Sequence, residues 1–475
     1  MPTILGANSV SGGYEIDNSL RFNDGDTAEL TRTPSSEGEL KKHTISMWFK
    51  RCTSGTNHAL FSAGVEGGVV YSIRFISDAL YLSQSSNFVK ATNSLFRDPS
   101  AWYHIVIAAD STLSTQNDRI KMYVNGVLET SFSENTFGGG QNLDFEVNDD
   151  VLHAVGYDTI NNSLPFDGYI SEFHLIDGTQ LAASDFGEFN DNGVWIPKAY
   201  EGTYGTNGVY LEFKQTGTGT DASGMGADTS GNDLHYAPVN LAATDVTTDT
   251  PTNNFCTMNP LDNFYQGSTF LEGNTKVTTT NSVISWNTGT FGLSSGKWYW
   301  EMKVIEVAVG DNTNYMNVGI ASSMATANNV QFSFNANDYA YAARYGKVKS
   351  NNEAGTTHGA AWTTNDIIGF AVDLDNNRLA FSKNGQWADG SGNSDEANIN
   401  AQITIAAAAD TPTGFYFPAV GDNLSGDGMT VSMNFGNAPY AISSGNADAN
   451  GYGNFEYAVP SGYYSLCTKN LGEFG

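Results

Sequence analysis

Positively charged residues and cysteines are scarce in this sequence. The 475 residues include 22 Lys and Arg against 51 Asp and Glu, which gives a formal net charge of −29. A charge of this sign repels nucleic-acid phosphates and anionic membrane surfaces, so we expect neither as a partner. The three cysteines, Cys52, Cys256 and Cys467, are too few for a disulfide framework. We expect small buried residues and leave a Cys256–Cys467 bond open.

Long apolar runs and helical repeats are also missing. No stretch of 18 apolar residues is present, so we predict no membrane insertion. Residues 1–10 lack the basic region and the apolar core of a secretory signal. We therefore expect no export by a signal peptide, so that the protein stays in the cytoplasm or leaves by cell lysis or another signal-free route. No heptad or collagen-like repeat supplies a trimeric stalk.

Glycine and aromatic residues are abundant. The sequence has 51 glycines and 12% aromatic residues, while charged residues make up only 15%. This composition is typical of short strands, tight turns and aromatic packing. The length suits two or three domains. We predict an all-β protein of two consecutive antiparallel β-sandwiches, a jelly roll and then a second sandwich, joined by a Gly/Thr/Asp-rich bridge.

Residues 1–200 read as alternating strands separated by turns. In residues 44–50 apolar and polar positions alternate, as in a strand with two different faces. Residues 119–132 contain Asn125-Gly126, the pair that best tolerates the positive φ angles of a two-residue hairpin turn. Residues 166–177 form another alternating strand. Strands at regular spacing without helical patterns predict a jelly-roll sandwich over residues 1–200.

Three motifs in this region resemble the laminin-G or concanavalin A-like family. They are Trp-Tyr-His at 102–104, Tyr-Val-Asn-Gly at 123–126 and Phe-Asp-Gly-Tyr-Ile-Ser-Glu-Phe at 166–173. The resemblance covers about residues 15–200 and implies a fold, not a ligand. Residues 201–260 follow as the bridge, with one or two strands and a polar loop from Gln215 to Asn232.

Five ordered motifs in residues 261–475 resemble the SPRY domain. They lie at Gly296–Glu301, Asn317–Ala321, Asp366–Gly385, Phe415–Val420 and Val431–Gly436. The resemblance covers roughly 180 residues. It implies a β-sandwich that binds partners through its loops and does no chemistry. Residues 351–360 and 388–398 are the candidate loops of this kind.

Catalytic chemistry finds no support in the sequence. A glycosidase needs two carboxylates about 5 to 10 Å apart, and on one strand this requires acids on the same face. Asp144 and Glu146 have no third acid at the right spacing, and Glu172 and Asp177 face opposite ways on a regular strand. No Gly-x-Ser-x-Gly elbow is present. We therefore predict no catalytic residue, no enzyme activity and no organic cofactor, and read His104 and His174 as packing residues.

Calcium is the one metal that the sequence leaves open. Asp24 and Asp26 lie in Asn23-Asp-Gly-Asp26, which concentrates the hard oxygen atoms that calcium prefers. Asp and Asn also favour turns for backbone reasons alone. Both interpretations remain open.

The densest group of cations and aromatic residues lies in residues 338–349. Tyrosine offers a flat apolar face and a hydroxyl, and arginine can bridge two acceptors. A ligand-binding site is predicted at Tyr339, Tyr341, Arg344, Tyr345, Lys347 and Trp362. The alternative is an ordinary strand whose aromatic face points inward, with Trp362 and Trp387 in the core.

The two sandwiches together resemble bacteriophage virion fibre or appendage proteins, marine ones especially. The resemblance implies a virion location after assembly in the host cytoplasm. The expected partners are other virion proteins, further copies of the same chain, and a host cell-surface glycan or protein bound by a tail or surface fibre. A capsid decoration or head fibre with a purely structural role is the alternative, and a glycan-degrading enzyme is a third hypothesis. Head or tail location stays open.

Overall fold

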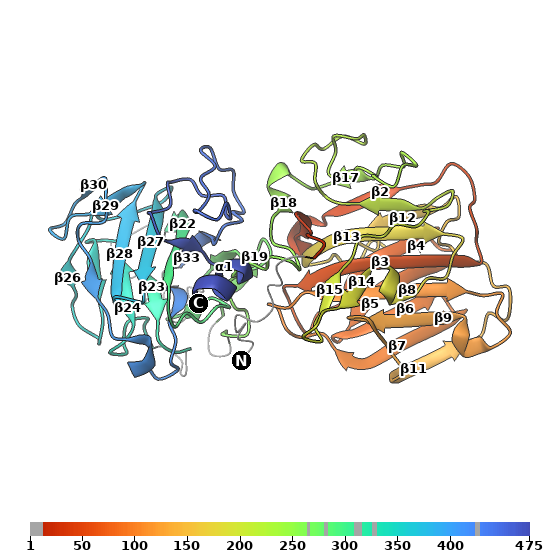
Figure 1. Ribbon diagram of the computed structural model, residues 1–475, viewed down its shortest axis with the longest axis horizontal. Helices are drawn as coiled ribbons and strands as arrows, with labels where there is room; N and C mark the ends of the chain where they lie inside the picture. Colours follow the sequence, from red (N-terminus) through yellow and green to blue (C-terminus); the bar gives the residue numbers. More distant parts are fainter. Residues whose placement is uncertain (1–12, 264–266, 280–283, 308–315, 325–329, 423–427) are drawn as a thin grey trace. The chain divides into compact units, whose positions relative to one another are not determined.

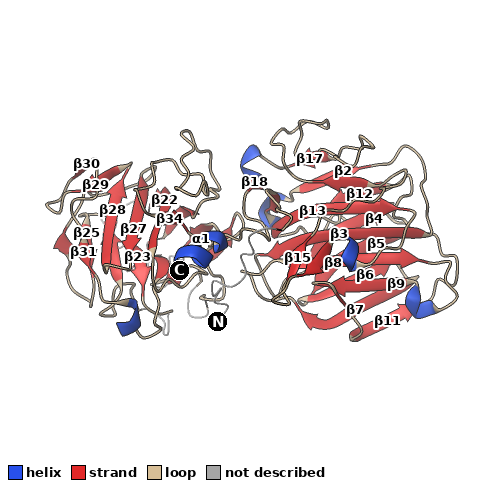
Figure 2. Cartoon of the chain, in the orientation of Figure 1, coloured by secondary structure: helices blue, strands red, loops and turns tan. Residues whose placement is uncertain are grey.

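The computed structural model describes residues 13–475 except 264–266, 280–283, 308–315, 325–329 and 423–427. Residues 1–10, where we expected no signal, lie outside this part. The chain divides into two compact units, one ending at Thr252 and the other beginning at Asn253. Strands make up 41% and helices 5% (Figure 2), so the predicted all-β class is confirmed. No helix among the described residues has the length and apolar character needed to cross a bilayer.

The first unit is a sandwich of two eight-stranded antiparallel sheets (Figure 1). The first sheet runs β10 (Val127–Leu128), β9 (Ile120–Val124), β8 (Tyr103–Asp110), β3 (Lys42–Arg51), β13 (Gly168–Asp177), β1 (Ser19–Phe22) and β18 (Val246–Thr247), with β16 (Val209–Leu211) also paired to β13. The second sheet runs β11 (Phe132–Phe137), β7 (Phe88–Leu95), β6 (Ala79–Gln84), β5 (Val70–Ile76), β4 (His58–Gly64), β12 (Leu152–Val155), β2 (Glu29–Arg32) and β17 (Ala237–Val239). Ile45, Met47 and Phe49 of β3 share one buried core with Phe61 of β4 and Ile73 of β5.

The central strands of the first sheet are buried on their other face as well. Apolar residues of β8 and β13 pack there against Phe186, near a small sheet of β14 (Gly187–Phe189) and β15 (Trp195–Pro197). Further along β3, Lys50 is buried against Asp249. The strand β3 is therefore covered on both faces, although its sequence alternates.

The segment expected as a bridge contributes strands to this sandwich. It holds β16, β17 and β18, three strands where we expected one or two, and they pair with β13, β2 and β1. Each has only two or three residues, too few for an alternating pattern to be visible. The division between the compact units falls at Thr252, inside the expected bridge of residues 201–260.

The second unit is built from two further sheets. The larger runs β19 (Thr269–Leu271), β20 (Lys276–Thr278), β33 (Met429–Asn434), β22 (Lys297–Val307), β27 (Ile367–Asp373), β28 (Arg378–Lys383), β29 (Gln386–Ala388) and β30 (Ser394–Glu396), with β31 (Ile403–Thr404) on β28 and β34 (Tyr464–Ser465) on β22. The smaller runs β21 (Trp286–Thr288), β32 (Phe417–Asp422), β23 (Met316–Ala321), β24 (Tyr339–Ala342), β25 (Lys347–Lys349) and β26 (Thr356–Thr357). A short helix, α1 (Thr468–Phe474), follows.

The cysteines behave as small buried residues. All three thiols are free and buried, which confirms the expectation from the sequence. Cys256 and Cys467 come from neighbouring segments, because the Cys256 N–H donates to the carbonyl of Leu466 and Phe255 is bridged to Cys467. No disulfide joins them.

Candidate functional site

The turn between β24 and β25 carries an exposed aromatic ring flanked by cations. Tyr345 is 56% exposed. The guanidinium carbon of Arg344 lies 4.9 Å from the centre of its ring, and the Nζ atom of Lys347 lies 5.9 Å from it. Both distances are within the range of cation–π attraction. We call Arg344, Tyr345 and Lys347 the basic tip.

Gly346 gives the basic tip its shape. Its φ of +57° lies in the left-handed region, and a Cβ atom there would sit 1.8 Å from the carbonyl oxygen of Gly359. Only glycine fits such a position without displacing backbone. The Gly346 carbonyl in turn accepts the backbone N–H groups of His358 and Gly359 at 3.1 and 2.9 Å, so the turn is held by the following loop.

Both loops that we named from the sequence meet behind this turn. The Gly390 N–H donates to the His358 carbonyl at 2.9 Å, and the Ala360 N–H donates to the Ser394 hydroxyl at 3.1 Å. In each of these two bonds, one partner belongs to residues 351–360 and the other belongs to residues 388–398. The structure therefore brings the two predicted loops and the basic tip together.

The other predicted aromatic residues lie in the core. Tyr341 is fully buried, stacks on Phe381 with ring centres 4.9 Å apart, and donates its hydroxyl to the Ala360 carbonyl. Trp362 is 3% exposed, as the alternative interpretation expected. Tyr339 is half-buried, and its hydroxyl accepts the Ala406 N–H at 3.0 Å. Because β24 alternates, Tyr339 and Tyr341 share its inward face, and Tyr345 is the one predicted aromatic residue that is mostly exposed.

A third cation, Lys349, lies two positions after Lys347 on the same strand, β25. Burial, and then the neighbouring charge of Lys347, lowers the pKa of Lys349 on the same strand. Lys347 and Lys349 therefore lie close enough on β25 for their positive charges to repel each other. Such a patch favours an anionic group on a partner, and the exposed ring adds a flat apolar surface.

The surroundings of Glu172 could not be predicted from the alternating pattern of its strand. The strand β13 is irregular between Ser171 and His174, and Glu172 has a φ of +52°, so the regular strand that we assumed is wrong at this point. The Glu172 carboxylate accepts the hydroxyls of Tyr14 at 3.2 Å and Tyr210 at 2.6 Å. Burial, followed by the charge of Glu172, raises the pKa of Tyr14 to about 12, which keeps this phenol a donor.

Glu172 and Asp177, the acids considered as a catalytic pair, make hydrogen bonds within the fold. Asp177 accepts the backbone N–H groups of Glu39 at 2.8 Å and Asn207 at 2.9 Å, whereas Glu172 accepts tyrosine hydroxyls. The histidines predicted as packing residues are buried, and His174 stacks on Tyr210 at 4.3 Å between ring centres. Burial lowers the pKa of His104 to about 3, so this imidazole stays neutral.

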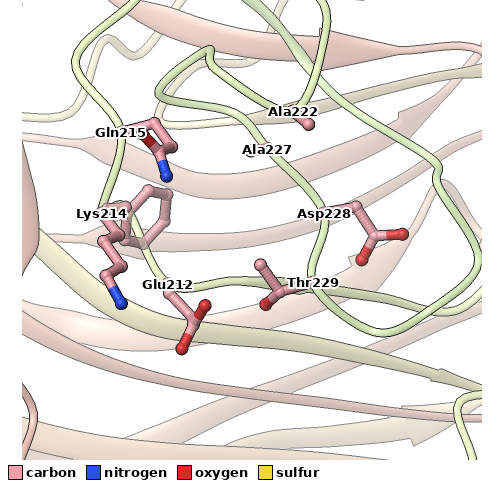
Figure 3. A pocket seen from close by; sticks show the side chains of 8 residues that line it. Glu212, Lys214, Gln215, Ala222, Ala227, Asp228 and Thr229 are labelled. Carbon is pink, nitrogen blue, oxygen red and sulfur yellow. The ribbon is translucent and has the colours of Figure 1, made fainter.

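A small pocket lies in the polar loops of the first unit (Figure 3). Its walls include Glu212, Lys214, Asp228 and Thr229, and its volume is about 70 Å³. Small-molecule sites usually measure roughly 300 to 1,000 Å³. The Asp228 carboxylate is already bonded to the N–H groups of Tyr210 and Leu234, both at 2.9 Å. The pocket has room for water and not for a sugar ring.

The predicted calcium residues occupy a short 3-10 turn. Asp24 and Asp26 lie in this turn, and the Asn23 amide donates to Asp26 at 2.8 Å. Among the described residues, the carboxylates close enough to share a metal ion belong to Glu37, Asp149 and Asp150. Calcium at Asp24 and Asp26 stays a prediction.

Two family models match the chain in order. Residues 23–184 match a laminin-G-type model of the concanavalin A-like lectin/glucanases superfamily. Residues 297–437 match the SPRY domain model. These matches confirm the two resemblances drawn from the motifs. Each covers less than half of the chain.

Sequence relatives share about 147 residues with this chain. The Ran-binding proteins 9/10 homolog of Drosophila melanogaster is 31% identical over 31% of this chain and 13% of its own length. Human Ran-binding protein 9 is 27% identical over 31% of this chain and 17% of its own length. The chain thus spans less than a fifth of either relative.

Two solved structures are similar to parts of the chain. The SPRY domain of human HERC1 is 15% identical, with a TM-score of 0.26 over 37% of this chain and 96% of that domain. A putative carbohydrate binding protein from Bacteroides ovatus is 15% identical, with a TM-score of 0.32 over 47% of this chain and 58% of its own. From the family models, the chain carries a concanavalin A-like domain followed by a SPRY domain, two domains of the binding type.

Proposed function

We propose that this chain is a non-enzymatic adhesin of a bacteriophage virion that binds a host-surface glycan or protein through the basic tip of its SPRY unit. The observation that carries the proposal is the combination of a ring that is 56% exposed with two flanking cations in a chain of net charge −29. Long-range repulsion from an anionic host surface is screened beyond roughly 8 to 10 Å. Attachment then depends on local contacts, which the basic tip provides.

Two findings support binding over catalysis. The matched families are binding domains, and the candidate acids Glu172 and Asp177 are engaged in separate hydrogen-bond networks. The sequence relatives are named for binding a protein, which favours a protein partner for the SPRY unit. The concanavalin A-like match supports a glycan partner equally, so the class of receptor is left to experiment.

The main test replaces Arg344 and Lys347 together with Glu. Both side chains are half-buried at the edge of a turn, so the fold should persist. We expect attachment of labelled protein to host cells to fall about tenfold, or about 1.4 kcal/mol. Circular dichroism and the unfolding temperature report whether the fold is kept.

A matched control separates contact from net charge. The double variant Lys198→Glu and Lys214→Glu makes the same charge change at two exposed positions of the first unit. It should bind as wild type does. Equal losses in both double variants, or none in the first, would contradict the basic tip and favour a purely structural capsid decoration. Antibody labelling of virions would distinguish head from tail, and virions without the protein would contradict the virion location.

The absence of enzyme activity has its own test. Purified protein is incubated with laminarin, agar, alginate and host envelope polysaccharide, and reducing ends are measured. We expect no release above a heat-treated control. Release that disappears in Glu172→Gln would show that the third hypothesis, a glycan-degrading enzyme, is right.

A further inference from the structure

A lysine and an aspartate are buried together in the first unit. Lys50 lies near the end of β3, and Asp249 follows β18, so 199 positions separate them in sequence. Their side chains are both 0% exposed, and the Lys50 ammonium contacts the Oδ2 atom of the Asp249 carboxylate. Two charges without water around them carry a large desolvation penalty, which an ion pair repays only in part.

The walls of this site are aromatic and its polar contacts are specific. The Nζ atom of Lys50 lies 4.7 Å from the ring centre of Tyr169 and 5.7 Å from that of Trp102. The indole N–H of Trp102 donates to Oδ1 of Asp249 at 3.1 Å. The Ser19 hydroxyl donates to the Asp249 backbone carbonyl at 2.6 Å. Amine, carboxyl group and a hydrogen-bond donor are thus fixed against one another.

Other titratable groups lie close to the pair, among them Arg21, Cys52 and Asp167. Register places Lys50 opposite Tyr169, and Tyr169 opposite Arg21, across three adjacent strands. Arg21 pairs with Asp245 at 3.1 Å. Burial, followed by the charge of Asp167, raises the pKa of the nearby Cys52 thiol well above its ordinary value. This thiol therefore stays protonated and does not compete as a nucleophile.

We propose that Lys50 and Asp249 condense after folding to an intramolecular isopeptide bond. A proton passes from the Lys50 ammonium to the Asp249 carboxylate, which removes both charges and suits a dry site. The neutral Nζ then attacks Cγ of Asp249. The Trp102 N–H stabilises the negative charge that develops on Oδ1, as an oxyanion-hole donor does.

The reaction balances without any further reagent. The C–N bond forms as the Cγ–Oδ2 bond breaks, and Oδ2 leaves as one water molecule with two protons that came from the ammonium. Oδ1 remains as the amide carbonyl oxygen, and one N–H remains on Nζ. Fixed geometry replaces a bimolecular encounter by an intramolecular one, an advantage that reaches roughly 10⁵ to 10⁸ M in effective concentration. The product has a buried neutral amide in place of the ammonium and the carboxylate.

The bond would close a covalent loop within the first sheet. It joins β3, in the middle of the first sheet, to the segment after β18, which is the outer strand of that sheet. A crosslink of distant residues restricts the unfolded chain, as a long-range disulfide does. The first unit would then resist pulling and heating without any cysteine pair.

Mass spectrometry of the full-length protein tests the proposal directly. Under denaturing conditions, we expect the intact mass to be lower than the calculated mass by one water molecule. Tryptic digestion should give a branched peptide that joins the segments around Lys50 and Asp249, without cleavage after Lys50. The full calculated mass with normal cleavage after Lys50 would overturn the proposal, as would loss of water without the branched peptide.

Variants and an internal control locate the reaction. Asp249→Ala and Lys50→Arg should each retain the full calculated mass. Trp102→Phe keeps the aromatic wall and removes the N–H donor, so conversion should become slower or incomplete. The exposed pair of Lys41 and Asp144, 2.6 Å apart, should give no branched peptide in the same digest. The wild-type measurement decides the proposal even where a variant fails to fold.

Discussion

The most deeply buried ion pairs of the two units differ in how far their cations are exposed. In the first unit Lys50, Arg51 and Arg21 have side chains no more than 2% exposed, and each is paired with an aspartate. In the second unit Lys297 and Lys383 pair with aspartates while 34% and 24% exposed. In the basic tip the two cations are half-buried and Tyr345 is 56% exposed. Loss of a buried cation leaves its aspartate as an unpaired buried charge and costs much stability, whereas loss of a more exposed cation costs little.

The largest expected difference between the units is their response to acid. Burial lowers the pKa of His43, His58 and His104 to about 3 and that of His153 to about 4, all in the first unit. In the unfolded chain these groups titrate near pH 6.5. Below that pH the unfolded state binds more protons, so stability falls, by roughly 1.4 kcal/mol per group for each pH unit.

The second unit should tolerate the same change of pH. It holds one histidine, His358, whose pKa burial also lowers. Burial raises the pKa of Glu301 and Asp338, and a raised carboxyl pKa favours the folded state as pH falls. Urea unfolding at pH 7, 6 and 5, with limited proteolysis to assign each transition, measures this. Parallel losses in both units would contradict the comparison.

The next largest effect concerns the buried pair of Arg51 and Asp78. Burial opposes the charge of Asp78, but hydrogen bonds from Gly55, Arg97 and Arg51 hold its pKa below the usual value. Asp78→Asn keeps a residue type that tolerates the φ of +70° at this position. It leaves the buried guanidinium of Arg51 without its anionic partner. We expect a loss of about 3 kcal/mol in the free energy of unfolding of the first unit, measured by urea denaturation.

The matched control removes an exposed arginine that bonds the same Asp78 carboxylate. Arg97 bonds Asp78 at 2.9 Å but is 62% exposed. Arg97→Ala should therefore cost at most about 1 kcal/mol. If Arg97→Ala destabilises the unit as much as Asp78→Asn does, then the burial of a cation does not determine how much its ion pair contributes to stability.

A glycine substitution tests the shape of the basic tip. Gly346→Ala places a Cβ atom against the Gly359 carbonyl oxygen in a left-handed conformation. We expect a loss of roughly 1 to 3 kcal/mol in the stability of the second unit, together with weaker attachment to host cells. Gly414 also has a positive φ, +79°, but nothing lies within 4 Å of a Cβ atom there. Gly414→Ala should cost less and leave attachment unchanged.

The smallest expected effect is that of the exposed ring alone. Tyr345→Ala removes the aromatic face that Arg344 and Lys347 flank and should weaken attachment by roughly 0.5 to 1 kcal/mol. Phe334, which is 49% exposed in the same unit, supplies the control Phe334→Ala. A direct binding assay that shows equal losses for both would mean that any exposed ring serves, and the basic tip would lose its special role.

The sequence by itself determined the strands, several turns and the two sandwiches. These are local properties: alternating side chains mark a strand, and Asn125-Gly126 forms the predicted turn, with φ angles of +45° and +79° between the paired residues Val124 and Val127. It also located the segment that holds the basic tip and the two loops behind it. The strands of residues 209–247 were too short for their pattern to reveal which sheets they join.

Only the tertiary structure decided which side chains are exposed and which charges are paired. Tyr341 and Tyr345 are the same residue type four positions apart, yet one is stacked in the core and the other is mostly exposed. Lys50 meets Asp249 because strand order places β1 between β13 and β18. Burial and pairing depend on which distant segments the fold brings together, and a linear pattern records only near neighbours along the chain.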